Sequence, residues 1–310
     1  MKRKTGMSTS RRMIGLISLL LMVALIAGMM GCDEAEPGVG PGSVAFADAR
    51  LESAIKEAIG VPEGPVYPEN LEGLTSLHVP YWWGADVITD LSGVEHCINL
   101  KELDLGFTMI NDVSPLAGLT GLTFLSFYSD EISDISPLVN LTGLTELNLG
   151  GRRIEDISPL ASLTSLGRLN IEGTGISDLS PLVGLRNLTA LSLGDNLIGD
   201  ISPLAGLTNL REIGLDMNEI SDISPLANLT GLVYLNLDEN RVTDVSPLAG
   251  LTRLHRISLY DNRVSDIGPL VDNPGLGEGD YVILIHNPLS GRAINEHIPA
   301  LEARGVTVHY

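Results

Sequence analysis

Apolar residues recur along this chain with a period of 22 from Leu100 onward. Each period contains the pattern L-x-x-L-x-L, whose three columns begin at Leu100, Leu103 and Leu105. The first column continues without a gap through Leu122, Leu144, Leu166, Leu188, Leu210, Leu232 and Leu254. Because apolar and polar residues alternate in L-x-L, we expect one short β-strand with a single buried face in each period. A unit this small cannot bury its apolar face alone, so we expect the units to stack side by side.

The second half of each period is equally regular and predicts a tight helical turn. It reads I-S-D-I-S-P-L at residues 132–138, and the other periods repeat this phrase closely. A serine at the N-cap and a proline at the first helical position favour a helical turn, and the short period leaves room only for a 3₁₀ helix. The predicted fold class is therefore an α/β solenoid, with a parallel β-sheet on its concave side and 3₁₀ or extended segments on its convex side.

A polar column follows the strand and is expected to close the corner of each repeat. Its last four members are asparagines, whose amides can bond backbone groups in the next turn: Asn196, Asn218, Asn240 and Asn262. The earlier members are Thr108, Asp130, Arg152 and Thr174. Since these side chains bond the backbone less well, we expect a looser corner in the repeats between residues 100 and 187.

Changes in composition along the chain predict five segments. Residues 1–31 are expected to form a signal peptide, and residues 32–45, rich in Gly, Pro and acids, a flexible tether. Residues 46–73 are expected to form a helical N-terminal cap, in which Asp48 begins a helix with Leu51 and Ile55 on its apolar stripe. The repeats occupy residues 74–275, and residues 276–310 form the last repeat and an α/β C-terminal cap. Caps are needed because a terminal repeat would otherwise expose its core.

These residues resemble the internalin-type family of bacterial leucine-rich-repeat proteins. The resemblance rests on the 22-residue period, the asparagine after the strand, the acidic N-terminal helix and the phrase I-S-D-I-S-P-L-A-N-L-T at residues 220–230. It covers roughly residues 45–289. The resemblance implies a sickle-shaped protein that binds its partners on the concave face.

The first 32 residues predict export and lipid attachment. Before an apolar run at residues 13–30, the chain has five basic residues and no acid: Lys2, Arg3, Lys4, Arg11 and Arg12. The run ends on Gly31-Cys32, which resembles the cleavage site of bacterial lipoproteins, although Met29 and Met30 replace the usual residues. We therefore expect a lipid on Cys32 to hold the chain on the outer face of a bacterial membrane, at the cell surface or in the periplasm. An uncleaved membrane anchor and a twin-arginine signal are the alternatives.

The charge of the chain narrows its possible partners. The formal net charge is −20, and removal of residues 1–31 with their five basic residues takes it to −25. A surface with this much negative charge disfavours binding to nucleic acid or to anionic lipid. We therefore expect the chain to contact the membrane only through its N-terminal lipid. After Cys32 the only cysteine is Cys97, which fills an apolar column, and the mature chain therefore has no intramolecular disulfide.

The sequence contains no motif for catalysis, a cofactor or a metal. Its six histidines do not stand at metal-ligand spacing, and neither a G-x-S-x-G motif nor a P-loop occurs. We therefore expect a binding protein rather than an enzyme. An aspartate column from Asp90 to Asp266 has two interpretations, a calcium ladder or carboxylates bonded to the adjacent Ser-Pro-Leu turn. The second is favoured because three consecutive backbone N–H donors are expected beside each aspartate.

Aromatic residues at outward strand positions are the candidate ligand-binding residues. Aromatic residues make up only 4% of the chain, and those at exposed strand positions fit the composition of binding hot spots. The alternative is that these rings merely cover neighbouring strands. The expected main contact consists of Tyr81, Trp82, Trp83, Phe107, Phe124 and Tyr128. The expected secondary contact consists of Tyr234, Arg256 and Tyr260. Small residues between the two are expected to offer a partner little to bind, among them Ala190, Ser192, Gly194 and Gly214.

The leading functional hypothesis is a surface-tethered protein that binds a protein or a glycan on its concave sheet. About ten strands at ~4.8 Å spacing give a surface on the order of 45 Å long, large enough for a standard protein interface. One alternative is a structural protein of the cell envelope, whose repeats pack into a layer without a discrete ligand. Another is a periplasmic module that captures glycans by stacking its exposed rings on sugars.

Overall fold

The structure, a computed structural model, describes residues 42–79 and 87–310. The predicted signal peptide, the lipid attachment residue Cys32, most of the predicted tether and the candidate residues Tyr81, Trp82 and Trp83 lie outside these residues. Within the described ranges, no helix is long and apolar enough to cross a membrane.

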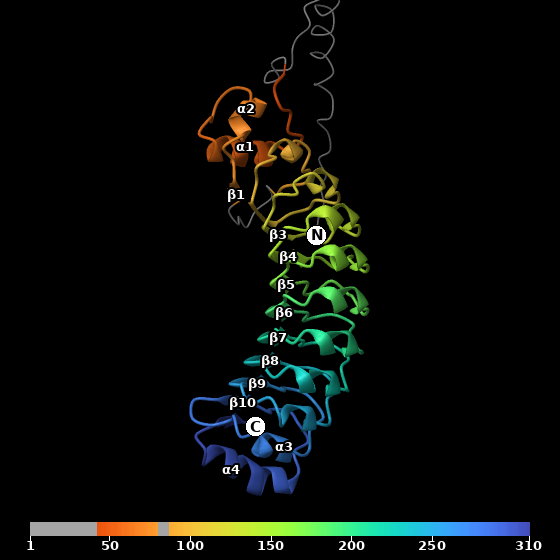
Figure 1. The fold of residues 1–310 in the computed structure, drawn as a ribbon, viewed down its shortest axis with the longest axis vertical. Helices are drawn as coiled ribbons and strands as arrows, with labels where there is room; N and C mark the ends of the chain where they lie inside the picture. Colours follow the sequence, from red (N-terminus) through yellow and green to blue (C-terminus); the bar gives the residue numbers. More distant parts are fainter. Residues whose placement is uncertain (1–41, 80–86) are drawn as a thin grey trace, which may run out of the picture. The chain divides into compact units, whose positions relative to one another are not determined.

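One parallel sheet organises the described part of the chain (Figure 1). Its eleven strands lie side by side in chain order, and each bonds in parallel to the next. The strands are β1 (Ser76–His78), β2 (Glu102–Phe107), β3 (Phe124–Tyr128), β4 (Glu146–Gly150), β5 (Arg168–Asn170), β6 (Ala190–Ser192), β7 (Glu212–Gly214), β8 (Tyr234–Asn236), β9 (Arg256–Ser258), β10 (Tyr281–Ile283) and β11 (Thr307–His309). The predicted solenoid of 22-residue repeats is confirmed.

Short helical turns form the side of each repeat that lies away from the sheet. The 3₁₀ helices are η1 (Val94–His96), η2 (Ser114–Leu116), η3 (Ser136–Asn140), η4 (Ser158–Ser162), η5 (Ser180–Gly184), η6 (Ser202–Gly206), η7 (Ser224–Asn228) and η8 (Ser246–Leu248). A short α-helix, α3 (Gly268–Asp272), takes their place in the next repeat. Between sheet and turns lies a single aliphatic core, which includes Leu147 and Leu191. Cys97 is buried in this core as expected, and burial raises the pKa of its thiol to about 12.

The aspartate column bonds these turns as the favoured interpretation predicted, but the serine cap and the number of donors differ from the prediction. No serine side chain caps a turn, and the residue before the serine takes the N-cap position. Instead, Asp134 Oδ1 accepts the N–H of Ser136 at 2.8 Å, and the same bond recurs from Asp90 to Asp266. From Asp112 to Asp266 a proline without an N–H follows, so each of these aspartates gains one backbone donor rather than three; beside Asp90, the N–H of Gly93 donates to Glu95 instead. The bond from the Ser136 N–H, together with the serine hydroxyl, lowers the pKa of the Asp134 carboxyl.

The corner after the strand also differs from the prediction in two repeats. Thr108, Thr174 and the four asparagines of the column are buried. Asp130 and Arg152 are exposed, and the preceding residues Ser129 and Gly151 are buried in their place. These two repeats have five-residue strands, so the inward alternation continues one position further along the chain. A side chain at Gly151 would meet the Ser129 carbonyl oxygen, which explains the glycine.

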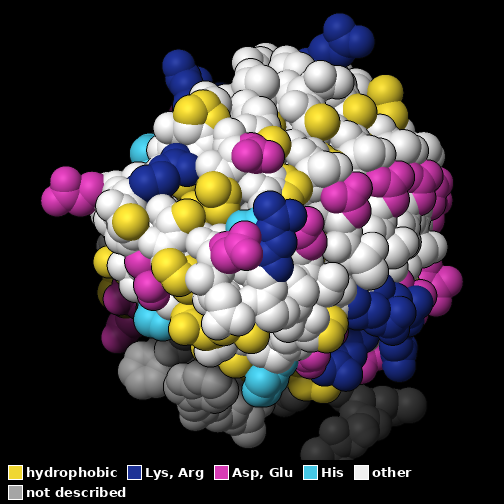
Figure 2. All heavy atoms as spheres, turned by 90° about the horizontal axis from the view of Figure 1, so that it is seen from below, with side chains coloured by type: hydrophobic (Ala, Val, Ile, Leu, Met, Phe, Trp, Pro, Cys, Tyr) yellow, Lys and Arg dark blue, Asp and Glu magenta, His cyan; other side chains and the backbone are white. Residues whose placement is uncertain are grey.

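Both ends of the core are covered by other structure. At the N-terminal end, Asp48 accepts hydrogen bonds from the N–H groups of Arg50 and Leu51 and so begins helix α1 (Ala49–Ala58), which precedes the short helix α2 (Pro68–Leu71). At the C-terminal end, a π-helical turn, η9 (Ala293–His297), continues into α4 (Ile298–Glu302). Figure 2 views this end from below, where apolar side chains are scattered among polar ones rather than joined in one surface.

Candidate functional site

Outward side chains form three rows across the strands of the sheet. Strand register aligns Glu146, Arg168, Ala190, Glu212 and Tyr234 in a first row, called the Glu212 row. The Ser192 row lies two residues further along each strand and contains Asn148, Asn170, Ser192, Gly214 and Asn236. The Asp216 row follows two residues after that and contains Glu172, Gly194, Asp216 and Asp238. Because the fold needs none of these side chains in its core, they are free to specify a ligand.

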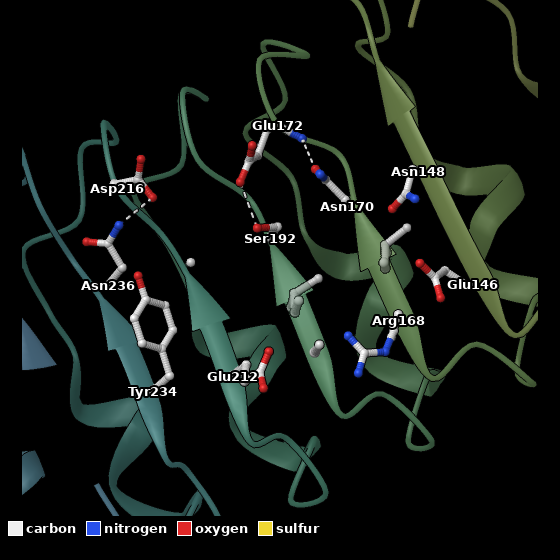
Figure 3. A pocket seen from close by; sticks show the side chains of 14 residues that line it. Glu146, Asn148, Arg168, Asn170, Glu172, Ser192, Glu212, Asp216, Tyr234 and Asn236 are labelled. Carbon is white, nitrogen blue, oxygen red and sulfur yellow. Dashed lines mark hydrogen bonds between the residues drawn. The ribbon is translucent and has the colours of Figure 1, made fainter. Parts of the chain in front are cut away.

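The centre of the sheet face is hollowed at the Ser192 row (Figure 3). The hollow has a volume of about 450 Å³, and Ala190, Ser192 and Gly214 are among its lining residues. Their small side chains leave the space that larger residues would fill. A Cβ atom at Gly214 would lie only 3.2 Å from Ser192 Oγ. From the sequence, this stretch was expected to offer a partner little to bind, and the structure shows that its absence of bulk forms the hollow.

The walls of the hollow are mainly acidic. Four carboxylates line it, from Glu146, Glu172, Glu212 and Asp216, against a single cation, Arg168. Within the described residues, none of the four lies within ion-pair distance of a lysine or arginine. Burial raises the pKa of the Asp216 carboxyl, and the nearby charges of Glu172, Asp238 and Glu239 add to this rise, against a backbone hydrogen bond that lowers it. The hollow therefore carries more negative than positive charge, with four carboxylates against the one guanidinium of Arg168.

Hydrogen bonds between rows hold the walls in place. Ser192 Oγ donates to Glu172 Oε1 at 2.7 Å, and Asn236 Nδ2 donates to Asp216 Oδ1 at 2.9 Å (Figure 3). On the opposite wall, the half-buried ring of Tyr234 stands beside Glu212. Burial, with the charge of Asp216, raises the pKa of the Tyr234 hydroxyl. The hollow is thus fixed in shape by contacts within the chain.

A second, smaller hollow continues the first toward the N-terminal end of the sheet. Its volume is about 240 Å³, and it shares Asn148, Asn170 and Glu172 with the central hollow. Phe107 and Tyr128 line its far side, with ring centroids 5.0 Å apart and planes tilted by 57°. The two hollows together form a groove that crosses the strands from β2 to β8.

Two glycines make this aromatic pair possible. Gly106, at a φ of 60°, introduces a bulge in β2, which shifts the register so that Phe107 lies beside Tyr128. The ring of Tyr128 also lies over Gly150, where a Cβ atom would come within 2.2 Å of the ring. A chain with larger residues at either glycine could not hold the pair in this arrangement.

The third aromatic residue predicted for this contact lies apart from the pair. Phe124 is half-buried and pairs across the sheet with Glu102 and Glu146. It precedes Tyr128 by four residues on the same strand, a separation of about 13 Å. Phe124 therefore lies in line with the Glu212 row, whereas Phe107 and Tyr128 lie toward the other edge of the sheet face.

The residues predicted for the secondary contact also lie in separate places on the sheet face. Tyr234 lies opposite Arg256 and belongs to the central hollow. Tyr260 lies beyond the end of β9, and its ring stands 4.9 Å from that of His286. The Arg256 guanidinium lies 5.8 Å from the ring centre of Tyr281, which is 44% exposed. Tyr281 and His286 were missed by the sequence pattern, because the glycine-rich insert before β10 hides their alignment with the earlier repeats.

No metal-binding cluster accompanies these surfaces in the described part of the chain. There, no group of three or more His, Cys, Asp or Glu side chains is arranged to hold a metal ion. The aspartate column, the other candidate for a metal, uses its carboxylates to bond the turns. The face presents hydrogen-bonding groups, charge and aromatic rings to its surroundings.

Comparison with known proteins assigns this architecture to a family. A family model described as Leucine Rich repeats (2 copies) matches residues 120–162, 164–206, 186–228 and 230–272. The crystal structure of an internalin (inlF) from Listeria monocytogenes has 31% sequence identity to the chain and a TM-score of 0.64. The match covers 85% of this chain and 90% of that one. The chain belongs to the internalin family.

Other comparisons agree with this membership. The structure of internalin C2 (inlC2) from the same species is 31% identical, with a TM-score of 0.57, and the match covers 82% of this chain and 99% of that chain. The functional domain of InlJ from L. monocytogenes, at 20% identity, shares the fold, with a TM-score of 0.62 over 85% of this internalin and 60% of that chain. A search of curated proteins found no match. Leucine-rich-repeat proteins of the internalin type generally mediate protein binding.

Proposed function

We propose that this internalin is an exported protein that binds a protein partner in the groove on its sheet face, and that it is not an enzyme. The observation that carries the proposal is the groove itself, which runs from Phe107 to Tyr234 and is lined by side chains that the core does not use. Its aromatic end offers rigid apolar contact, and its polar centre offers hydrogen-bonding groups already in position. These two features are typical of protein recognition surfaces.

The groove is large enough for a stable complex. Seven strands at ~4.8 Å spacing extend over about 29 Å, close to the dimension of a standard protein interface. The proposal keeps Phe107, Tyr128 and Tyr234 as contact residues and places Phe124, Arg256 and Tyr260 at its margins. Tyr81, Trp82 and Trp83 remain proposed contacts on the strength of the sequence alone.

Cross-linking from the sheet face tests the proposal directly. Phe107→p-benzoylphenylalanine, made in the full chain and illuminated in cells, should yield an adduct with one partner protein. The matched control is the same replacement at Val183, which is 50% exposed on the turn side. An adduct from position 183 alone, or equal adducts from both positions, would place binding elsewhere.

We also propose that a lipid on Cys32 tethers the chain to the outer face of a bacterial membrane. The support is the order of basic segment, apolar run and Gly31-Cys32 in the sequence. Cells fed labelled palmitate should label the wild-type chain but not Cys32→Ser. Cys97→Ser should label normally, because Cys97 is buried in the core. Labelling of the Cys32→Ser variant would contradict the tether.

A further inference from the structure

The central hollow has a charge pattern that selects one kind of partner group. The carboxylate of Glu212 stands on the wall formed by its row, and those of Glu172 and Asp216 stand on the opposite wall (Figure 3). Rows four residues apart are separated by about 13 Å along the strands. Small residues leave the space between the walls open. A group that enters there meets negative charge on two sides.

Among the described residues, no three carboxylates of the hollow are arranged to hold a single metal ion. Glu146 on β4 and Glu212 on β7 are three strands apart, or about 14 Å. A metal ion needs several oxygen ligands within about 2.6 Å. Carboxylates this far apart fit instead a long, flexible cation with an apolar stem.

The ring of Tyr234 supplies a surface for such a stem. It lines the hollow beside Glu212 and is half-buried, so its position is fixed before a partner arrives. Aromatic faces attract ammonium and guanidinium groups, and the methylene stems of lysine and arginine pack well against rings. The carboxylates without a lysine or arginine at ion-pair distance, the open space and the ring therefore point to the same ligand.

We propose that the central hollow receives a lysine or arginine side chain of the partner polypeptide, with Glu172, Glu212 and Asp216 around its charge and Tyr234 beside its stem. This inference rests on the proposed function and names the chemistry of the partner. The rest of the partner segment extends across the strands toward Phe107 and Tyr128, which contact an apolar residue of the same segment.

Charge-matched variants test the assignment with labelled peptides. The probes are a decapeptide of alternating lysine and glycine and its counterpart with glutamine for lysine, measured by fluorescence anisotropy against the full chain. The lysine peptide should bind at least tenfold more tightly than the glutamine peptide. Glu212→Gln with Asp216→Asn should weaken lysine-peptide binding at least tenfold.

The control variant removes the same charge elsewhere. Glu155→Gln with Asp272→Asn, both exposed and outside the groove, should change binding less than twofold. Equal weakening by the two double variants would mean attraction to the overall negative charge and would overturn the proposal. Ser192→Leu, which fills the hollow but keeps every carboxylate, should also weaken binding at least tenfold, and unchanged binding by a folded Ser192→Leu chain would refute the site.

Two outcomes separate this inference from the proposed function. If the Phe107 cross-link captures a protein while lysine and glutamine peptides bind equally, the groove binds a partner but the basic side chain is wrong. If a labelled neutral hexasaccharide binds in a Tyr234-dependent manner that ignores the carboxylates, the hollow belongs to a glycan and the inference fails. Failure of the cross-link as well would overturn the proposed function itself.

Discussion

Replacing Asn218 with alanine tests whether polar corners, as well as apolar packing, hold neighbouring repeats together. Asn218 is buried, and its side chain bonds backbone groups of two successive repeats. Its Oδ1 accepts the N–H of Ile198 at 3.0 Å. Its Nδ2 donates to the carbonyls of Leu193, Leu215 and Asp216 at 2.9 to 3.1 Å. The substitution removes all four bonds while leaving the apolar columns intact.

The expected loss of unfolding free energy depends on which backbone groups lose their only hydrogen-bond partner. The Leu193 and Leu215 carbonyls each accept a second bond, from the amides of Asn196 and Asn240. The Ile198 N–H has no other acceptor among the described residues. A buried N–H left without a partner costs about 1–3 kcal/mol, and the loss of the amide donors adds about 1 kcal/mol in total, because all three carbonyls keep a second donor. We therefore expect Asn218→Ala to lower the free energy of unfolding by about 2–4 kcal/mol.

Urea unfolding of the full chain, followed by circular dichroism, measures this change. With a slope of about 2 kcal/mol per molar urea, the midpoint should fall by on the order of 1 M. The matched control is Asn209→Ala, because Asn209 is exposed and makes one bond, to the Arg186 carbonyl at 2.8 Å. If Asn218→Ala were no more destabilising than Asn209→Ala, the corner would not contribute as argued.

Three further predictions concern the core, the bulge and the central hollow. Leu147→Ala should lower the free energy of unfolding by about 2–5 kcal/mol, whereas Val139→Ala, at an exposed position, should change it little in the same urea assay. Gly106→Val should cost about 1–3 kcal/mol in that assay, because a β-branched residue is strained at a φ of 60°. The folded chain raises the pKa of the Asp216 carboxyl and so favours its protonated form. The stability that this carboxyl contributes is therefore full below its pKa in the unfolded chain and is lost as the pH rises through its pKa in the folded chain. Asp216→Asn should therefore raise the melting temperature at pH 7, and the gain should vanish near pH 3; a gain that grew toward low pH would contradict this sign.

The repeat and its register were predictable from the sequence because the core repeats without gaps. Every apolar column demands the same buried position, so the period alone assigns Leu147 and Leu191 to the core, and both are buried. The corners were harder to predict. Ser129 and Gly151 replace the expected Asp130 and Arg152, since the local strand runs further and the sequence period alone does not report strand length.

The binding face was only partly predictable, for a physical reason. Alternation along each strand identified Tyr128 and Tyr234 as outward residues, which the structure confirms by placing both in the groove. It did not predict that a bulge at Gly106 would move Phe107 beside Tyr128. Nor did it predict the hollow, because a hollow arises from small residues on several strands at once and no single strand carries its signal.

The corner residue and the character of the groove are linked along the chain. Where an asparagine closes the corner, the residue before it turns the chain at a positive φ, as at Asp195 with 53° and Met217 with 54°, and the strand has three residues. The Asp216 row then lies on the loop after the strand and faces the hollow. Where the asparagine is absent, β3 continues as a strand as far as Tyr128, and a ring can lie flat over the neighbouring Gly150. The acidic centre of the groove therefore lies where the strands end after three residues, including β5 with Thr174 at its corner, and the apolar end lies where β3 runs further.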